Sequence, residues 1–141
     1  MAIEKSLTIG MLAKSAEVNV ETVRFYERKG LLKKPKKRGA FRYYPQNYIA
    51  RIRFIKRSQE LGFTLKEARE LLDLRVKDEA KCSDVLIRTE DKVAEIEQKI
   101  ADLKKMKKSL KNLAKCCEDR SLPLSDCPIL ECFIKQKVKG R

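Results

Sequence analysis

Residues 18–31 have the sequence VNVETVRFYERKGL, which contains the signals for both ends of one short helix. Asn19 can cap the start of this helix, because a side-chain oxygen at that position accepts from the first free backbone N–H groups. Gly30 favours the left-handed conformation with which many helices end. We therefore predict a helix over residues 20–29, with Val20 and Val23 facing inward. The side chains expected to face solvent are Arg24, Tyr26 and Arg28.

A second short helix is expected just before this one. Residues 8–14 (TIGMLAK) begin with a capping threonine and place Ile9, Leu12 and Ala13 on one face. Residues 15–19 then interrupt the pattern with a tight turn. Two short helices joined by such a turn are typical of a helix-turn-helix, whose second helix enters the major groove of DNA. The residues expected to enter first are Glu21, Thr22 and Arg24.

A small β-ribbon is expected after these two helices. Residues 33–45 (KKPKKRGAFRYYP) form two extended pieces around a basic turn that contains Gly39. A ribbon of this kind, or wing, can follow the sugar-phosphate backbone of DNA.

Two further helices are expected beyond the wing. Residues 46–61 have the apolar periodicity of an amphipathic helix. Thr64 and Glu67 have the spacing of a capping box, in which each side chain accepts from the other residue's backbone, so a fourth helix should follow through Leu74. The basic side chains expected on the exposed face of the third helix are Arg51, Arg53, Lys56 and Arg57.

Positive charge is concentrated in the first part of the chain. The 141 residues carry a net charge of +14, and residues 1–81 contribute 20 Lys and Arg against 10 Asp and Glu. Residues 28–59 contain twelve Lys and Arg and no acidic residue. The aromatic residues interleaved with them include Phe41, Tyr43, Tyr44 and Tyr48. Each basic side chain that neutralises a phosphate releases condensed counterions, so this segment predicts a nucleic-acid surface. A solvated basic face or a patch for anionic membranes is the alternative.

The composition excludes several classes of protein. No apolar run is long enough to cross a bilayer, and the first residues, MAIEK, lack an export signal, so a soluble cytoplasmic protein is expected. The absence of histidine removes the imidazole-dependent triads and every zinc site that contains histidine. The chain also lacks a Cys-x-x-Cys motif and a phosphate-binding loop, so we expect a binding protein and not an enzyme.

These motifs resemble the signature of the MerR family of transcription regulators. The resemblance rests on LTIG at residues 7–10, the segment 18–31, RYY at residues 42–44 and QELGFTLKE at residues 59–67, and it covers nearly all of residues 7–74. It implies a winged helix-turn-helix homodimer that binds double-stranded promoter DNA and, with its effector bound, distorts and untwists that DNA for RNA polymerase. The residues that it places near DNA are Arg24, Tyr26, Arg42 and Arg53, and Thr22 and Tyr43 complete the set of candidate contacts.

A long helix is expected in the second half of the chain. Residues 82–117 contain neither proline nor glycine, and apolar residues recur at alternating spacings of three and four, which is typical of a coiled-coil seam. One heptad column contains Leu86, Val93 and Ile100. The other column contains Cys82, Thr89, Ile96, Leu103, Leu110 and Cys117.

Cys82 and Cys117 lie 35 residues apart in that column, which is roughly 50 Å along one helix. Metal-sulfur bonds of about 2.3 Å cannot span that distance, so these two cysteines of one chain cannot bind the same ion. Two such helices packed antiparallel about Lys99 and Ile100 would instead bring Cys82 of one subunit opposite Cys117 of the other. A shared site of this kind requires a homodimer.

The residues beyond the long helix supply a third thiol. Residues 118–125 form a loop that lets Cys127 fold back on Cys117. Cys82 from one subunit, with Cys117 and Cys127 from the other, would form a site for a soft, thiophilic metal. The cysteines are expected as free thiols or metal-bound thiolates, because a reducing compartment disfavours structural disulfides.

The cysteine pattern resembles that of the mercuric-ion regulators within the MerR family. The resemblance rests on DEAKC at residues 78–82, the 35-residue cysteine interval and CPI at residues 127–129. It implies Hg(II) as the effector, bound by three thiolates from two subunits. The loop before Cys127 is about one residue longer than usual, and Cys116 and Cys132 are additional thiols that could substitute as ligands. Cd(II) and Pb(II) are therefore alternative effectors, and a thiol redox sensor is a further alternative.

We therefore predict a mainly α protein with three parts. Residues 1–75 form a winged helix-turn-helix DNA-binding domain. Residues 76–117 form a linker and a long antiparallel coiled-coil dimerisation helix. Residues 118–141 form a short metal-binding loop and tail.

Overall fold

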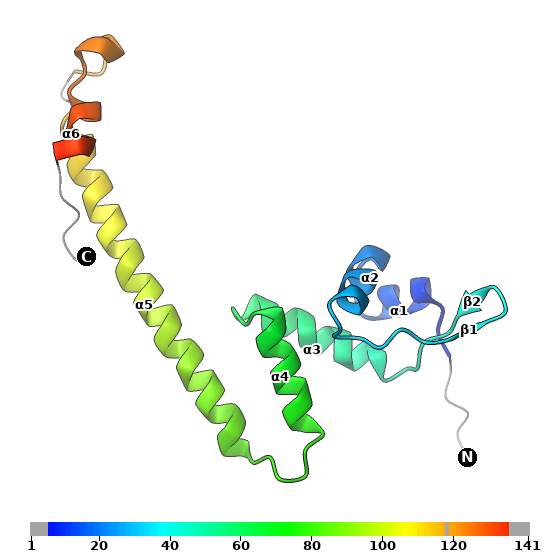
Figure 1. The fold of residues 1–141 in the computed structure, drawn as a ribbon. Helices are drawn as coiled ribbons and strands as arrows, with labels where there is room; N and C mark the ends of the chain where they lie inside the picture. The colour runs from blue at the N-terminus through cyan, green and yellow to red at the C-terminus, as the bar shows by residue number, and fades with distance from the viewer. Residues whose placement is uncertain (1–5, 118, 136–141) are drawn as a thin grey trace. The chain divides into compact units, whose positions relative to one another are not determined.

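The computed structural model describes residues 6–117 and 119–135. It divides into two compact units, Met1–Arg88 and Thr89–Arg141, and the boundary falls within the longest helix. The first unit holds α1 to α4 and a two-stranded sheet, and the second holds most of α5 with a short 3-10 helix and α6 (Figure 1). Within the predicted metal-binding loop and tail, residue 118 and residues 136–141 lie outside the described residues.

The predicted helix-turn-helix is confirmed. α1 spans Ile9–Ser15 and α2 spans Val20–Arg28. Thr8 caps α1 and Asn19 caps α2, and each side-chain oxygen accepts from the backbone N–H three residues on. Gly30 has a φ of 77° where the chain leaves α2, as the sequence predicts.

The wing is a short antiparallel ribbon. β1 (Lys37–Arg38) pairs with β2 (Phe41–Arg42), and the register places Lys37 opposite Arg42. Gly39 has a φ of 66° in the turn between the two strands, a backbone conformation that side chains other than glycine rarely adopt. The basic turn predicted from the sequence is therefore present.

Two helices follow the wing. α3 spans Tyr48–Glu60 and α4 spans Leu65–Arg75. The capping box at the start of α4 is confirmed, because the Thr64 backbone N–H donates to the Glu67 carboxylate at 2.8 Å and the Glu67 N–H donates to the Thr64 hydroxyl at 3.1 Å. The box satisfies two backbone N–H groups at the start of α4 and so marks where this helix begins.

The core of the first unit lies where the first three helices meet. α1 packs against α2 and α3, and α3 packs against α4. Burying each large apolar side chain stabilises the fold by about 1.5–3 kcal/mol, so this core holds α2 firmly against its neighbours. The largest fully buried side chains are Leu12, Val23, Leu31, Ile52 and Ile55.

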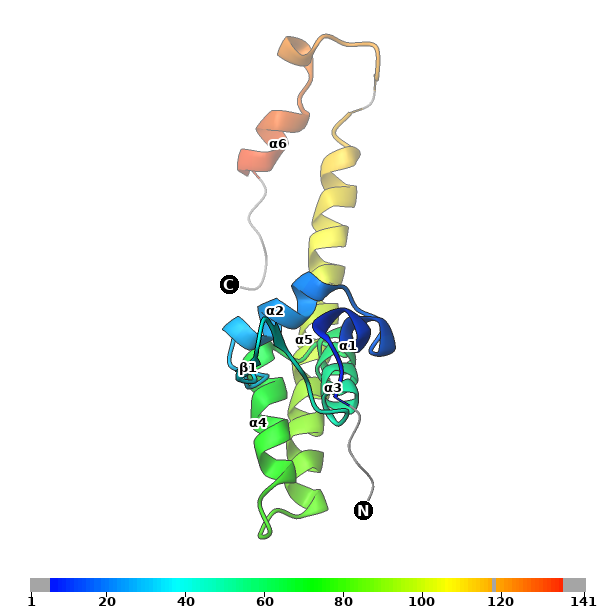
Figure 2. The same cartoon turned by 90° about the vertical axis from the view of Figure 1, so that its right-hand side faces the viewer.

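The long helix α5 spans Cys82–Ala114; Figure 1 shows it as one continuous helix, and both of its ends are also visible in Figure 2. The prediction that it reaches Cys117 is wrong. The backbone N–H groups of Cys116 and Cys117 bond to carbonyls three residues back, so the last turn tightens and the chain leaves the helical path. The apolar side chains of the predicted coiled-coil seam within α5 are exposed, including Val93 and Ile100.

Two short elements follow α5. The 3-10 helix η1 spans Leu124–Asp126, and α6 spans Ile129–Lys135. α6 was not predicted from the sequence. No helix in the described part of the chain is long and apolar enough to cross a bilayer.

Candidate functional site

The start of α2 presents a small polar cluster. Asn19 Oδ1 accepts from both the backbone N–H and the hydroxyl of Thr22, each at 2.8 Å. Arg24 Nη1 lies 3.2 Å from Glu21 Oε1, and both side chains are more than half exposed. An ion pair this exposed contributes little to stability, so the Arg24 guanidinium can exchange Glu21 for another anion at low cost.

A groove of about 410 Å³ lies between α2, the wing and the start of α1. Among the described residues that line it, Glu27 is the one acid and basic side chains dominate. A concave surface lined in this way attracts a phosphate backbone, because each neutralised phosphate releases counterions. The basic lining residues are Arg24, Arg28, Lys34, Lys37 and Arg42.

The wing contributes two of the predicted DNA contacts. Arg42 is half-buried, and its Nε donates to the Pro35 carbonyl at 3.0 Å, which holds the side chain across the base of the wing. Tyr43 is exposed. The structure therefore brings Arg42 to the same groove as Arg24, while Tyr43 lies on the wing itself.

The basic side chains of α3 differ from the expectation that all are exposed. Arg51 and Lys56 are half-buried, because Arg51 donates to the Leu31 carbonyl at 2.9 Å and Lys56 donates to the Glu17 carbonyl at 3.2 Å. Arg53 is exposed and donates to the carbonyl at the end of α1 at 2.8 Å. The Arg53 and Lys56 bonds join α3 to the end of α1 and the turn that follows it, where Glu17 has a φ of 59°. The Arg53 side chain thus extends from α3 to the end of α1, and its contact with DNA stays a prediction.

Tyr26 does not face solvent as predicted. Its side chain is 2% exposed, and its hydroxyl donates to Gln59 Oε1 at 2.8 Å. The helical periodicity assigned the wrong face, because α3 packs over the side of α2 that carries Tyr26. Its assignment as a DNA contact has no support from this geometry.

Tyr44 joins the base of the wing to α2. Its backbone pairs with Leu7, with N–H···O distances of 2.9 and 2.7 Å, and its hydroxyl donates to Glu27 Oε1 at 2.9 Å. Burial, followed by this hydrogen bond and the charge of Glu27, raises the pKa of Tyr44 to about 12. Glu27 Oε2 is buried and has no hydrogen-bond partner in the described part of the chain. The Tyr44 hydroxyl is therefore the donor that holds this carboxylate.

Replacing Tyr44 with phenylalanine is expected to lower the free energy of unfolding by about 1–3 kcal/mol at pH 7, because Glu27 loses its donor. The difference in the free energy of unfolding between wild type and Tyr44→Phe should become smaller as pH rises from about 10 to 12. An unfolded tyrosine ionises near pH 10, whereas the folded one keeps its proton to about pH 12, so the wild type loses stability across that window and the Tyr44→Phe protein lacks this contribution.

Urea unfolding between pH 7 and pH 11.5 measures this difference. The exposed Tyr43 supplies the control, since Tyr43→Phe removes the same atom and should change stability by less than about 0.5 kcal/mol. Equal stability of wild type and Tyr44→Phe at pH 7 would contradict the role of the hydroxyl. A difference that stays constant from pH 9 to pH 11.5 would contradict the raised pKa.

Cys117 and Cys127 come together beyond α5, as the sequence predicts. Partial burial, together with the charge of Cys127 and a hydrogen bond to it, raises the pKa of the Cys117 thiol. The Cys117 Sγ also lies 3.9 Å from the Asp119 carbonyl oxygen. Two thiols in contact are a donor pair that suits a soft metal ion, whose binding would displace their protons.

Cys82 is the first residue of α5 and is exposed. No group of three or more His, Cys, Asp or Glu within the described ranges of one chain could hold a metal ion. Cys117 and Cys127 therefore form a pair without a third ligand from the described part of their own chain. The assignment of Cys82 as that ligand, contributed by a second subunit, stays a prediction.

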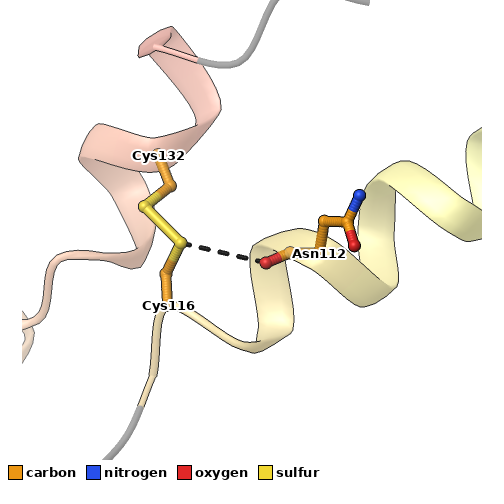
Figure 3. The surroundings of a disulfide bond; sticks show 3 residues. All are labelled: Asn112, Cys116 and Cys132. Carbon is orange, nitrogen blue, oxygen red and sulfur yellow. Dashed lines mark hydrogen bonds between the residues drawn. A yellow bond between two sulfur atoms is a disulfide. The ribbon is translucent and has the colours of Figure 1, made fainter.

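The remaining two cysteines correct one expectation. Cys116 and Cys132 form a disulfide, so they are neither free thiols nor metal-bound (Figure 3). The bond is reached because α6 returns to the end of α5 and brings the two Cα atoms to 6.8 Å, within the range that a disulfide spans. Residues 129–135 carry no local signal for α6, which explains the wrong expectation.

The chain is similar to known regulatory proteins over most of its length. Residues 7–74 match the MerR HTH family of regulatory proteins, and residues 49–113 match the MerR DNA-binding family. The mercuric resistance operon regulatory protein of Bacillus cereus is 43% identical over 129 residues, which are 91% of this chain and 97% of that protein. The chain belongs to the MerR family. The regulator ZntR of Escherichia coli strain K12 is 35% identical over 134 residues, which are 94% of each protein.

Two solved structures of MerR-family regulators share this fold. PbrR691 from Ralstonia metallidurans CH34, in complex with lead(II), superposes with a TM-score of 0.82 at 35% identity and covers 90% of this chain and 98% of its own. MerR from Bacillus megaterium MB1, in complex with mercury(II), has a TM-score of 0.70 at 40% identity and covers 93% of this chain and 100% of its own. The predicted fold class and the predicted resemblance to MerR regulators are confirmed, and the chain is a transcription regulator and not an enzyme.

Sequence reasoning missed two acceptors in this MerR-family DNA-binding unit. Gln59 accepts from a tyrosine 33 residues earlier in the chain, and Glu27 accepts from one 17 residues later. Neither pairing has a local sequence signal, since both depend on how α3 and the wing pack against α2. Glu27 could have been noticed as the last acid before the basic segment of residues 28–59.

Proposed function

We propose that this chain is a metal-responsive transcription regulator that binds promoter DNA as a homodimer and activates a mercury-resistance operon when its cysteine thiolates bind Hg(II). The observation that carries the proposal is the contact between Cys117 and Cys127 beyond the end of α5. The 43% sequence identity of this chain to a mercuric resistance operon regulatory protein supports Hg(II) as the effector.

The DNA-binding part of the proposal rests on the basic groove between α2 and the wing. α2 would enter the major groove with Thr22 and Arg24 at its leading end, and the wing would follow the backbone with Arg42 and Tyr43. Thr22 is tied to Asn19 and Arg42 to the Pro35 carbonyl, so both are held in position before DNA arrives.

The dimer part of the proposal rests on the exposed apolar seam of α5. A helix that leaves such a seam in water gains stability by packing it against another helix. A second copy of the chain is the partner, and antiparallel pairing would bring Cys82 of one subunit to Cys117 and Cys127 of the other. The exposed seam residues are Leu86, Val93, Ile96, Ile100, Leu103 and Leu110.

The metal part of the proposal follows from the donor set. Cys117 and Cys127 offer two thiols in contact, and Cys82 is exposed at the far end of α5, where a second subunit can reach it. Three sulfur donors favour a thiophilic ion over the hard cations that prefer oxygen. Bound Hg(II) would link the end of one subunit's α5 to the start of the other's.

The switch would act through the position of Cys82. Only residues 76–81 separate it from the end of α4, so fixing its side chain constrains how the DNA-binding unit is held. The dimer would move between a repressing and an activating arrangement, and the effector would favour the arrangement to which it binds more tightly. The activating arrangement would untwist the promoter for RNA polymerase holoenzyme.

A second effector class is favoured by one observation. The solved structure with a TM-score of 0.82 to this chain is a complex with lead(II), and its protein is 35% identical. A Cd(II)- or Pb(II)-responsive regulator would keep the same architecture and the same thiolate site. The metal preference of the purified protein separates the two alternatives.

An anaerobic titration of the fully reduced protein tests the proposal. Hg(II), Cd(II), Pb(II) and Zn(II) are added in turn under excess competing thiol, and sulfur-to-metal charge-transfer absorption reports binding. We expect selective retention of Hg(II) at two ions per dimer. The Cys132→Ser protein serves as the control and should retain the same amount. Preference for Cd(II) or Pb(II) would change the effector, and no retention of any of these ions would refute the metal-responsive function.

A further inference from the structure

The disulfide at the end of α5 has no part in the function proposed above. It joins Cys116, two residues after α5, to Cys132 in α6, and the sequence separation of the two cysteines is 16. In Figure 3 the two side chains point toward one another from the two elements, and Cys116 Sγ lies 3.9 Å from the Asn112 carbonyl oxygen. The bond closes the loop that carries Cys127.

The pairing is specific among the five cysteines. Cys116 and Cys117 are neighbours in sequence, yet Cys116 bonds to Cys132 while Cys117 contacts Cys127. Cys82 takes no part, since it lies at the opposite end of α5. The fold thus sorts four cysteines into two separate pairs. The thiols of Cys117 and Cys127 are suited to binding a metal ion, and the sulfur atoms of Cys116 and Cys132 are bonded to each other.

The bond also supplies what α6 lacks. A helix of seven residues is too short to be stable alone in water, and the exposed side chains Leu130, Phe133 and Ile134 show that α6 buries little of its apolar surface. A covalent link to the end of α5 is therefore a main constraint on where α6 lies.

We propose that Cys116 and Cys132 are a reversible oxidation site, at which disulfide formation fastens α6 to the end of α5 and reduction releases it. The inference rests on the proposed function in one respect. A regulator that binds promoter DNA works where thiols are kept reduced, and disulfides in such a compartment form transiently in response to an oxidant. The co-reactant is a low-molecular-weight disulfide of the glutathione class.

The chemistry proceeds by two exchange steps. The sulfur of one cysteine attacks the small disulfide, which breaks its S–S bond, forms a mixed disulfide with the protein and releases one small thiol. The sulfur of the second cysteine then attacks the protein sulfur of the mixed disulfide and releases the other small thiol. The protein loses two electrons and two protons, and the small disulfide gains them. Excess small thiol reverses both steps.

Equilibration with glutathione tests the proposal without metal or DNA, so its failure is distinct from failure of the proposed function. Full-length reduced protein is incubated in mixtures from fully reducing to fully oxidising, alkylated and mapped by mass spectrometry. We expect a Cys116–Cys132 bond that appears in intermediate mixtures and disappears in reducing ones. The bond should slow hydrogen exchange of the α6 amides by about tenfold or more.

Three variants sharpen the result. Cys132→Ser should abolish the bond and the change in exchange, whereas Ile134→Ser, at an exposed position of the same helix, should keep both. Cys127→Ser should keep the bond, because Cys127 belongs to the other pair. Oxidation that joins Cys117 to Cys127 or links two chains would overturn the proposal. So would the absence of any protein disulfide in oxidising mixtures, or a bond that survives the fully reducing mixture.

Discussion

A heterodimer of one Cys82→Ala subunit and one subunit carrying both Cys117→Ala and Cys127→Ala is expected to bind one Hg(II) ion under competing thiol. Each variant as a homodimer should bind none. In an antiparallel pair, the double variant supplies an intact Cys82 to the intact Cys117 and Cys127 of the other subunit, so one complete site forms and the second site has no cysteine left. We therefore expect two variants that bind no Hg(II) as homodimers to bind one Hg(II) ion when they are combined in a heterodimer.

The heterodimer can be isolated by co-expression with two different affinity tags and purification on both. Each homodimer should still bind operator DNA, because the substitutions lie outside the basic groove. Retained operator binding would show that the variant homodimers are folded, so that their failure to bind Hg(II) is due to the missing cysteines. A heterodimer that binds no Hg(II) would mean that the site is not shared between subunits, as would be the case for a parallel coiled coil.

Changing Arg24 to alanine is expected to weaken operator binding by about 10- to 100-fold, corresponding to roughly 1–3 kcal/mol, with or without Hg(II). Arg24 is exposed at the leading end of α2 and lines the groove between α2 and the wing. The substitution should leave the fold intact, since the ion pair with Glu21 that it removes is solvent-exposed. Fluorescence anisotropy with labelled operator DNA at several salt concentrations measures the change.

Lys104→Ala is the matched control for this experiment. It removes the same positive charge from an exposed position on α5, in the second compact unit. Long-range attraction of DNA to the net charge of the protein should change equally in the two variants, so a difference between them isolates the local contact. If both variants bind with the same affinity, Arg24 is not a DNA contact.

The predictable part of the fold is the part that short-range chemistry decides. The helix-end signals act on backbone groups within three or four residues in sequence, and each is present in the structure as predicted. They are the Asn19 cap, the left-handed Gly30 and the Thr64–Glu67 capping box. The same is true of the meeting of Cys117 with Cys127, which needs only a loop of the right length.

The unpredicted features depend on packing between distant segments. The helical period allowed Tyr26 to face solvent, and only the approach of α3 decides that it is buried against Gln59. The course of the chain after Ala114 is a second example. The seven residues of α6 are too few to show a helical pattern in the sequence, and the position of α6 depends on the bond between Cys132 and Cys116. Long-range pairing of this kind leaves no pattern in a single sequence.

The exposed seam of α5 also has a consequence for how the protein melts. Leu113 is the one buried apolar side chain among the 33 residues of this helix, so a lone chain gains little free energy from forming it. The first unit has its own buried core and should unfold at a temperature that is independent of concentration. With a second copy of the chain as the proposed partner of α5, melting of this helix should instead shift upward as protein concentration rises. Under the proposed pairing, a cell that makes few copies of this regulator would therefore hold some of it as intact DNA-binding units with an unpaired α5.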